Sequence, residues 1–188
     1  QKPIHYFGLD QFSIPSISTD DLVEIGHVNF EEEKIPCFGG YGDLQASVHG
    51  ASPTDSDWII NLGTGSQIIS LIPTYSQEFE IRKYFNQREI SCVTHIPAGR
   101  ALNVFANFFS EVREEKSVEY FWNKLASVDP RTLANDAPNF DLAVFREAHG
   151  FKNGGSICQI YENAFGAKHF FEGLLNSFLE QYLSLLTT

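Results

Sequence analysis

The sequence contains no methionine, only three cysteines and few basic side chains. Its 13 lysine and arginine residues stand against 24 aspartate and glutamate residues, which gives a formal net charge of −11 at pH 7. Proteins that bind nucleic acid or an anionic membrane through charge need a cluster of cationic side chains, and this composition does not supply one. We therefore expect neither nucleic acid nor a membrane among the partners.

The cysteines and histidines lack the spacing of a metal site. Cys37, Cys92 and Cys158 are far apart and form no CxxC pair, and the six histidines are scattered. This pattern excludes the common zinc motifs and indicates a reducing compartment. No apolar run approaches the roughly 18 residues of a membrane span. We expect a soluble, cytoplasmic protein with no metal site built from these residues.

The sequence has the composition of a folded protein. It has 188 residues, is 43% hydrophobic and contains 17 phenylalanines, enough for a substantial aromatic core. It begins with QKPIHYFG, which does not resemble a translation start and indicates a piece of a longer chain. Residues 1–34 are rich in turn-forming side chains and predict an irregular strap with a short extended stretch at 23–28.

Hydrophobic periodicity then predicts strands first and helices later. Residues 58–63 and 66–73 form a hairpin pattern, residues 88–97 a further strand, and residues 98–112 and 117–128 two helices. Residues 128–156 predict surface loops with short strands. Residues 167–186 predict a long amphipathic helix whose apolar stripe contains Phe170, Leu174, Phe178 and Tyr182. At its polar end, the Tyr182 hydroxyl is expected to reach a partner at the rim or water.

An aspartate surrounded by glycines begins a predicted helix at 43–51. Gly39, Gly40 and Gly42 precede Asp43, and Leu44 follows it. A carboxylate at this place serves either as a helix cap or as a general base, which glycines would let a substrate hydroxyl approach. The local pattern leaves both interpretations open.

Two further glycine positions predict contacts with an anion. Gly63, Thr64 and Gly65 occupy the tip of the predicted hairpin, where they form either an ordinary turn or a nest of N–H groups for a phosphate. Gly99 begins the helix at 98–112, whose N-terminus either is a plain helix start or meets a second anion. Arg100, next to it, is interpreted as a solvated surface charge.

The order of these motifs resembles the FGGY carbohydrate kinases. The matching segments are GYGDLQASVHGA, then INLGTGSQIISLIP, then a strand and a helix opened by Ala-Gly, and they are most similar to the branch of the family that phosphorylates sedoheptulose. The resemblance implies an actin-like, ribonuclease H-like α/β fold with a mixed sheet and flanking helices. Residues 1–36 would end the N-terminal kinase domain, and residues 37–188 would form the first part of the C-terminal domain.

The same resemblance implies the roles of seven residues, with ATP and Mg²⁺ as cofactors and a small sugar as substrate. Asp43 would be the catalytic base and contact the sugar together with Gln45. The nucleotide would be bound by Gly63, Thr64, Gly65, Gly99 and Asn103. Many members of the family have a polar residue directly after the aspartate, where this chain has Leu44.

The segments that complete such a kinase are not in this sequence. The D-x-G-S/T loop and the G-G-x-x-x-S segment are absent, so we expect the chain alone to be inactive and to need the remainder of the kinase as its partner. The apolar surface left uncovered also favours a homodimer. The alternatives are a non-catalytic actin-like module for nucleotide binding or interaction, and a module that binds sugar without nucleotide.

Overall fold

The computed structural model describes residues 8, 23–114 and 117–187, so most of the predicted strap lies outside the described residues. The chain divides into two compact units, Gln1–Ser52 with Lys83–Glu89 and Pro53–Arg82 with Ile90–Thr188. The boundary that we expect after residue 36 remains a prediction. No helix in the described ranges is long and apolar enough to cross a membrane.

The first unit contains a two-stranded ribbon and a short helix. Strands β1 (Glu24–Phe30) and β2 (Glu33–Phe38) pair antiparallel, with Val28 opposite Ile35. Helix α2 (Asp43–Gly50) follows, and its buried residues are Leu44 and Val48. One helical turn separates these two side chains, so they lie on the same face, and the predicted helix is confirmed.

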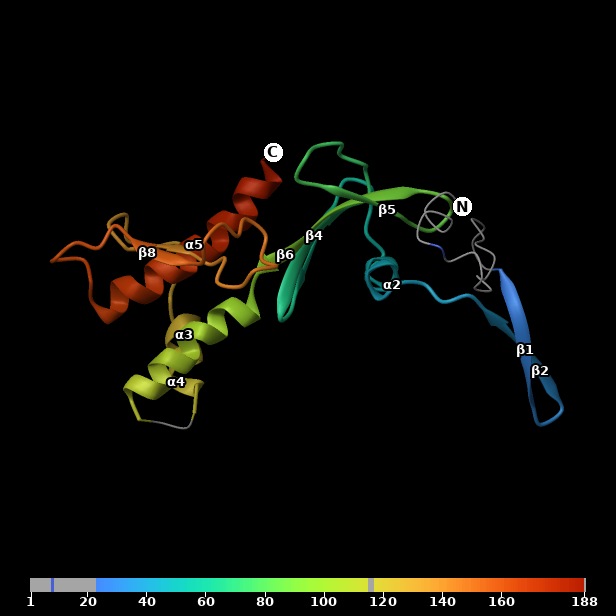
Figure 1. Cartoon of the computed structure of the whole chain (residues 1–188), viewed down its shortest axis with the longest axis horizontal. Helices are drawn as coiled ribbons and strands as arrows, with labels where there is room; N and C mark the ends of the chain where they lie inside the picture. Colours follow the sequence, from blue (N-terminus) through green and yellow to red (C-terminus); the bar gives the residue numbers. More distant parts are fainter. Residues whose placement is uncertain (1–7, 9–22, 115–116, 188) are drawn as a thin grey trace. The chain divides into compact units, whose positions relative to one another are not determined.

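The second unit is built on a sheet with strand order β3-β4-β6-β5 (Figure 1). The three predicted strands are confirmed as β3 (Trp58–Leu62), β4 (Gly65–Ser70) and β6 (Glu89–Pro97). Strand β4 pairs antiparallel with both β3 and β6. Strand β5 (Glu80–Lys83) was not predicted, because its four residues are too few to establish an alternating pattern.

The predicted helices of this unit are confirmed as α3 (Gly99–Val112), α4 (Glu119–Ala126) and α5 (Ala167–Leu186). Strand β7 (Asn139–Asp141) of the loop region pairs with β8 (Ser156–Cys158). Their core is an aromatic cluster in which the Phe140 and Phe170 rings meet edge to face, with centroids 4.9 Å apart. Val112, the last residue of α3, is 63% exposed.

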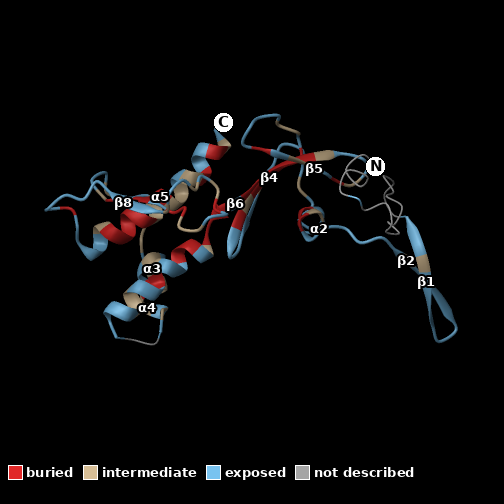
Figure 2. Cartoon of the chain, viewed as in Figure 1, coloured by how far each residue is buried: buried red, intermediate tan, exposed pale blue. Residues whose placement is uncertain are grey.

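Helix α5 packs in two cores at once. Phe170, Phe171 and Leu174 belong to the aromatic cluster, whereas Tyr182 and Leu185 pack with Ile68, Val93 and Ile96 of the sheet. Figure 2 shows this burial as red positions along α5, β4 and β6. The expectation for the Tyr182 hydroxyl is wrong, because it is buried and, within the described residues, has no hydrogen bond of normal geometry.

Replacing Gly173 by alanine is expected to destabilise the second unit. A Cβ atom at this position would overlap the backbone of Pro138, in front of β7, and neither backbone can move without disturbing the aromatic cluster. Overpacking of this kind costs about 1–3 kcal/mol, and guanidinium unfolding of the chain measures the loss. Gly50→Ala is the matched control, since a Cβ on that helical glycine meets nothing within 4 Å. Equal midpoints for the two variants would contradict the prediction.

Replacing Tyr182 by phenylalanine is expected to leave stability unchanged or to raise it by up to about 1 kcal/mol, since the lost hydroxyl makes no well-formed hydrogen bond within the described residues. Burial raises the pKa of the Tyr182 phenol, and the neighbouring Ser66 hydroxyl lowers it in part. The wild-type chain therefore loses stability as the pH rises past about 10, where the unfolded phenol ionises first, and the variant loses less. Urea unfolding at pH 7 and pH 10.5 tests both statements, with exposed Tyr161→Phe as the control.

Candidate functional site

Asp43 is the first residue of α2, directly after the helix N-cap Gly42. Its Oδ1 atom accepts a hydrogen bond of 2.7 Å from the Leu44 N–H, and its side chain is exposed. The carboxylate thus lies at the positive end of a helix, where negative charge is favourable. No described side chain covers it, so a hydroxyl group could approach.

Helix α2 is attached to the turn between β5 and β6, within the first unit. The Gln45 amide donates a hydrogen bond of 3.3 Å to the carbonyl oxygen of Lys83. The rings of Tyr41 and His49 pack on Phe85, with centroids 4.2 and 4.6 Å away. These contacts hold α2 in place at both of its ends. The bond of Gln45 to Lys83 is structural and comes in addition to the sugar contact predicted for Gln45.

The glycine turn and the start of α3 form one rigid junction within the second unit. The Gly99 N–H donates to the carbonyl of Gly63 at 3.1 Å, and the Arg100 N–H donates to the carbonyl of Thr64 at 2.7 Å. A Cβ on Gly99 would lie 2.9 Å from the Gly63 oxygen, closer than real side chains come. The structure therefore brings the two predicted nucleotide motifs together and requires glycine at 99.

This junction changes the interpretation of the helix N-terminus. The N–H groups of Gly99 and Arg100 are already bonded to the turn, so a ligand would have to meet other groups. Gly63, Thr64 and Gly65 are all exposed, and a Cβ on Gly65 would meet nothing within 4 Å. An anion could therefore approach the backbone of the turn closely.

Arg100 is exposed, as expected of a surface charge, but it also contacts two other side chains. Its guanidinium lies 4.3 Å from the centroid of the Phe145 ring and 3.6 Å from the Glu147 carboxylate. The residue thereby attaches the start of α3 to the loop that follows β7. Nothing in the local sequence indicates this contact, because the three residues are distant along the chain.

Asn103 lies one turn further along α3 and is exposed. It is on the same helix as Gly99, as predicted. Asp43 and Gln45 belong to the first unit and the other predicted residues to the second, so a common site for all seven remains a prediction.

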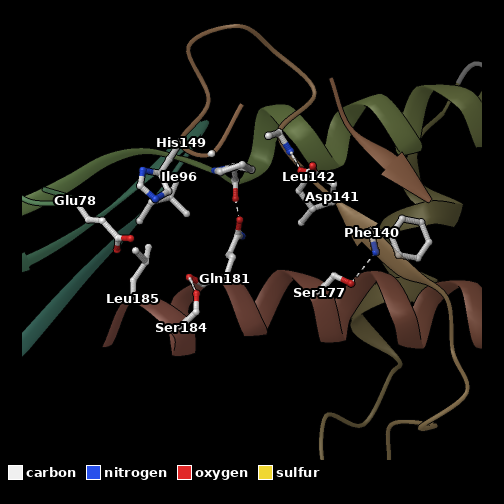
Figure 3. A pocket seen from close by; sticks show the side chains of 13 residues that line it. Glu78, Ile96, Phe140, Asp141, Leu142, His149, Ser177, Gln181, Ser184 and Leu185 are labelled. Atoms are coloured by element: carbon white, nitrogen blue, oxygen red, sulfur yellow. Dashed lines mark hydrogen bonds between the residues drawn. The ribbon is translucent and has the colours of Figure 1, made fainter. Parts of the chain in front are cut away.

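The second unit also contains a cavity of about 320 Å³ beside the end of β6 (Figure 3). Gln181 of α5 donates a hydrogen bond of 2.8 Å to the carbonyl of Pro97, and the Ser177 hydroxyl accepts one of 2.9 Å from the Phe140 N–H. Sequence reasoning missed these polar side chains, although Ser177, Gln181 and Ser184 interrupt the apolar character of α5 at helical spacing. Their bonds fix β6 and β7 to α5.

Among the described residues, no group of three or more acidic, histidine or cysteine side chains could hold a metal ion. A magnesium ion at the glycine turn would therefore need ligands from phosphate oxygens, from water or from outside the described residues.

The fold matches part of a known enzyme. The xylulose kinase from Rhodospirillum rubrum superposes with a TM-score of 0.66 at 17% sequence identity, over 87% of this chain and 36% of that chain. No protein-family model and no curated protein sequence matches the chain. The match confirms the predicted actin-like, ribonuclease H-like α/β fold with flanking helices, and this chain spans about a third of the length of that kinase.

Replacing Gly99 by alanine is expected to break the junction between the glycine turn and α3. The new Cβ would force the Gly63 carbonyl away, which costs about 1–3 kcal/mol and exposes the Gly99 N–H to exchange. Amide hydrogen exchange and urea unfolding measure the two effects. Gly65→Ala, two residues after Gly63 and free of clashes, is the control. Protection of the residue 99 amide at the wild-type level would show that glycine is not required there.

Proposed function

We propose that the chain is the central part of an ATP-dependent carbohydrate kinase of the FGGY family, which phosphorylates a ketose such as sedoheptulose. The support is the combination of the sequence motifs with a fold shared with a xylulose kinase. Because the chain spans 36% of that kinase, the activity belongs to the longer protein.

The observation that carries the proposal is the junction between the glycine turn and α3. Phosphoryl transfer depends mainly on alignment and on stabilisation of charge, so the phosphate site must be rigid. Two backbone hydrogen bonds and the close approach at Gly99 supply that rigidity. The exposed turn at 63–65, with glycines on both sides of Thr64, fits the phosphates of ATP.

The proposed reaction assigns one chemical step to Asp43. As the sugar oxygen bonds to the γ-phosphorus and the bond to the ADP oxygen breaks, the Asp43 carboxylate accepts the hydroxyl proton. Its exposed position at the start of α2 permits this approach, and Gln45 assists in orienting the sugar. Mg²⁺, when bound to the phosphates, would neutralise charge on their oxygens.

Asp43→Asn in the longer protein is expected to lower sugar-dependent ADP release about 10²–10⁴-fold, because the variant cannot accept the proton. A coupled assay across sedoheptulose, xylulose, ribulose and glycerol measures turnover and identifies the sugar. Asp136→Asn, an exposed loop aspartate, is the matched control and should retain activity.

The outcomes separate the candidate functions. ATP binding without turnover on any sugar would favour the non-catalytic actin-like module, and sugar binding without nucleotide would favour a sugar-binding module. Full activity of Asp43→Asn would remove Asp43 from the role of base. The 188-residue chain alone should release no ADP, because the sequence lacks the kinase loop that meets the γ-phosphate.

A further inference from the structure

Strand β6 contains one extra residue shortly before it meets the glycine turn. Away from the turn, Ile68 of β4 lies opposite Val93 of β6. Next to the turn the register has shifted by one position, and Ser66 lies opposite Ile96. Two residues of β6 therefore face the single Gln67 of β4, which is the arrangement of a β-bulge.

The bulge determines where β6 ends. The side chains of Val93 and Ile96 belong to the same core, although residues three apart in a regular strand point to opposite faces. The extra residue removes this mismatch and brings Pro97 opposite Gly65 of the turn. Two residues later, the Gly99 N–H reaches the hairpin carbonyl that it binds. The geometry of the junction thus depends on the bulge.

The backbone of the bulge has a conformation that residues other than glycine seldom adopt. His95 has a φ of 60°, in the left-handed region. Such conformations persist where surrounding contacts enforce them, and they are frequent at functional sites. One such contact is a hydrogen bond of 2.8 Å from the His149 N–H to the His95 carbonyl oxygen.

A chain of side-chain hydrogen bonds provides further contacts at the bulge. Thr94 is 7% exposed, and its hydroxyl donates to Oε1 of Glu80 in β5 at 2.9 Å. The same hydroxyl oxygen lies 2.9 Å from Nδ1 of His95. The other Glu80 oxygen, Oε2, accepts two hydrogen bonds from the Arg82 guanidinium, and these bonds hold the pKa of Glu80 below its usual value.

The hydrogen atoms in this chain have one consistent arrangement. An ionised carboxylate only accepts hydrogen bonds, so the single hydroxyl hydrogen of Thr94 points toward Glu80. The Thr94 oxygen then accepts a hydrogen from Nδ1 of His95. Thr94 is thereby bonded on both sides, and it joins β5 to the strained residue of β6.

We propose that this chain of hydrogen bonds, named here the bulge relay, positions the glycine turn for the phosphates of a nucleotide. The relay consists of Arg82, Glu80, Thr94 and His95. It holds the left-handed backbone at His95, the bulge sets the end of β6, and that end holds Gly99 against the turn. The inference rests on the proposed function, which assigns the phosphates to residues 63–65. Thr94 is a positioning residue, since it acts through the turn and not on the nucleotide.

Titration of the longer protein with ADP tests the role of Thr94. Thr94→Val keeps the shape of the side chain and removes both hydrogen bonds of the hydroxyl. We expect this variant to bind ADP at least fivefold more weakly, whereas Thr94→Ser, which retains the hydroxyl, should bind within twofold of the wild type. Calorimetry measures the affinities at a temperature at which circular dichroism shows every variant to be folded.

Thr54→Val is the matched control. The Thr54 hydroxyl donates a hydrogen bond of 2.8 Å to the Asp57 carboxylate, so this variant loses a bond of the same kind. Thr54 precedes β3, and it is the other end of β3 that leads into the glycine turn. The control variant should therefore bind ADP as the wild type does.

Variants of His95 separate the backbone from the imidazole. His95→Gly accepts a positive φ without steric cost, so the bulge no longer needs the relay. We expect it to bind ADP within threefold of the wild type, and adding Thr94→Val to it should weaken binding less than twofold further. His95→Val, whose Cβ is branched, opposes the left-handed backbone and should weaken binding at least fivefold.

Amide hydrogen exchange of the 188-residue chain follows the junction without nucleotide. In Thr94→Val the Gly99 N–H should exchange at least tenfold faster than in the wild type, because the displaced end of β6 weakens its bond to Gly63. Thr94→Ser and Thr54→Val should leave this exchange rate unchanged.

The outcomes distinguish this inference from the proposed function. The inference alone fails if the wild-type protein binds ADP and Thr94→Val binds it equally well, or if Gly99 exchange is unchanged in Thr94→Val. It also fails if His95→Gly and His95→Val lose the same affinity, because the imidazole itself would then contact the nucleotide. A wild-type protein that binds no ADP would instead overturn the proposed function, and this inference with it.

Discussion

The packing of α5 is the constraint on which the second unit depends. The phenyl rings of Phe170 and Phe171 join the aromatic cluster with α3, α4 and β7, and the far end of the helix covers the sheet through Tyr182 and Leu185. One rigid helix therefore fixes the distance between two separate cores. The contact between Gly173 and the Pro138 backbone sets how closely β7 approaches that helix, so the position of the loops after β7 follows from it.

Close backbone contact at a glycine recurs at the candidate phosphate site. Gly99 lets the N-terminus of α3 reach the carbonyls of the hairpin, and two hydrogen bonds then hold the turn. The polar side chains of α5 secure the strand that leads into this junction, since Gln181 binds the carbonyl of Pro97. The site is therefore supported by the helix that fills both cores, and a functional site needs such support to hold its geometry.

The elements that could be predicted from the sequence are those whose residue pattern is local and extends over many positions. The helices at 99–112 and 167–186 repeat their apolar pattern over several turns, and the hairpin at 58–70 has β-rich residues on both sides of a glycine turn. Sequence reasoning missed β5, which has four residues, and the contact of Arg100 with Phe145 and Glu147, which depends on distant segments. It also could not show that the Gly99 N–H binds the hairpin, because the pairing of two motifs is a tertiary property.

Because the net charge of the chain is negative, cationic side chains near the glycine turn matter for the proposed binding of a nucleotide. In the proposed function, an anionic nucleotide approaching a chain with a net charge of −11 would need local positive groups. Arg100 is such a group at the base of the turn, but its guanidinium is paired with Glu147 at 3.6 Å, and both side chains are more than half exposed. An exposed pair contributes only about 0–1 kcal/mol. Exchanging Glu147 for a phosphate oxygen would therefore cost little, whereas the cation–π contact with Phe145 would keep the guanidinium close to the turn.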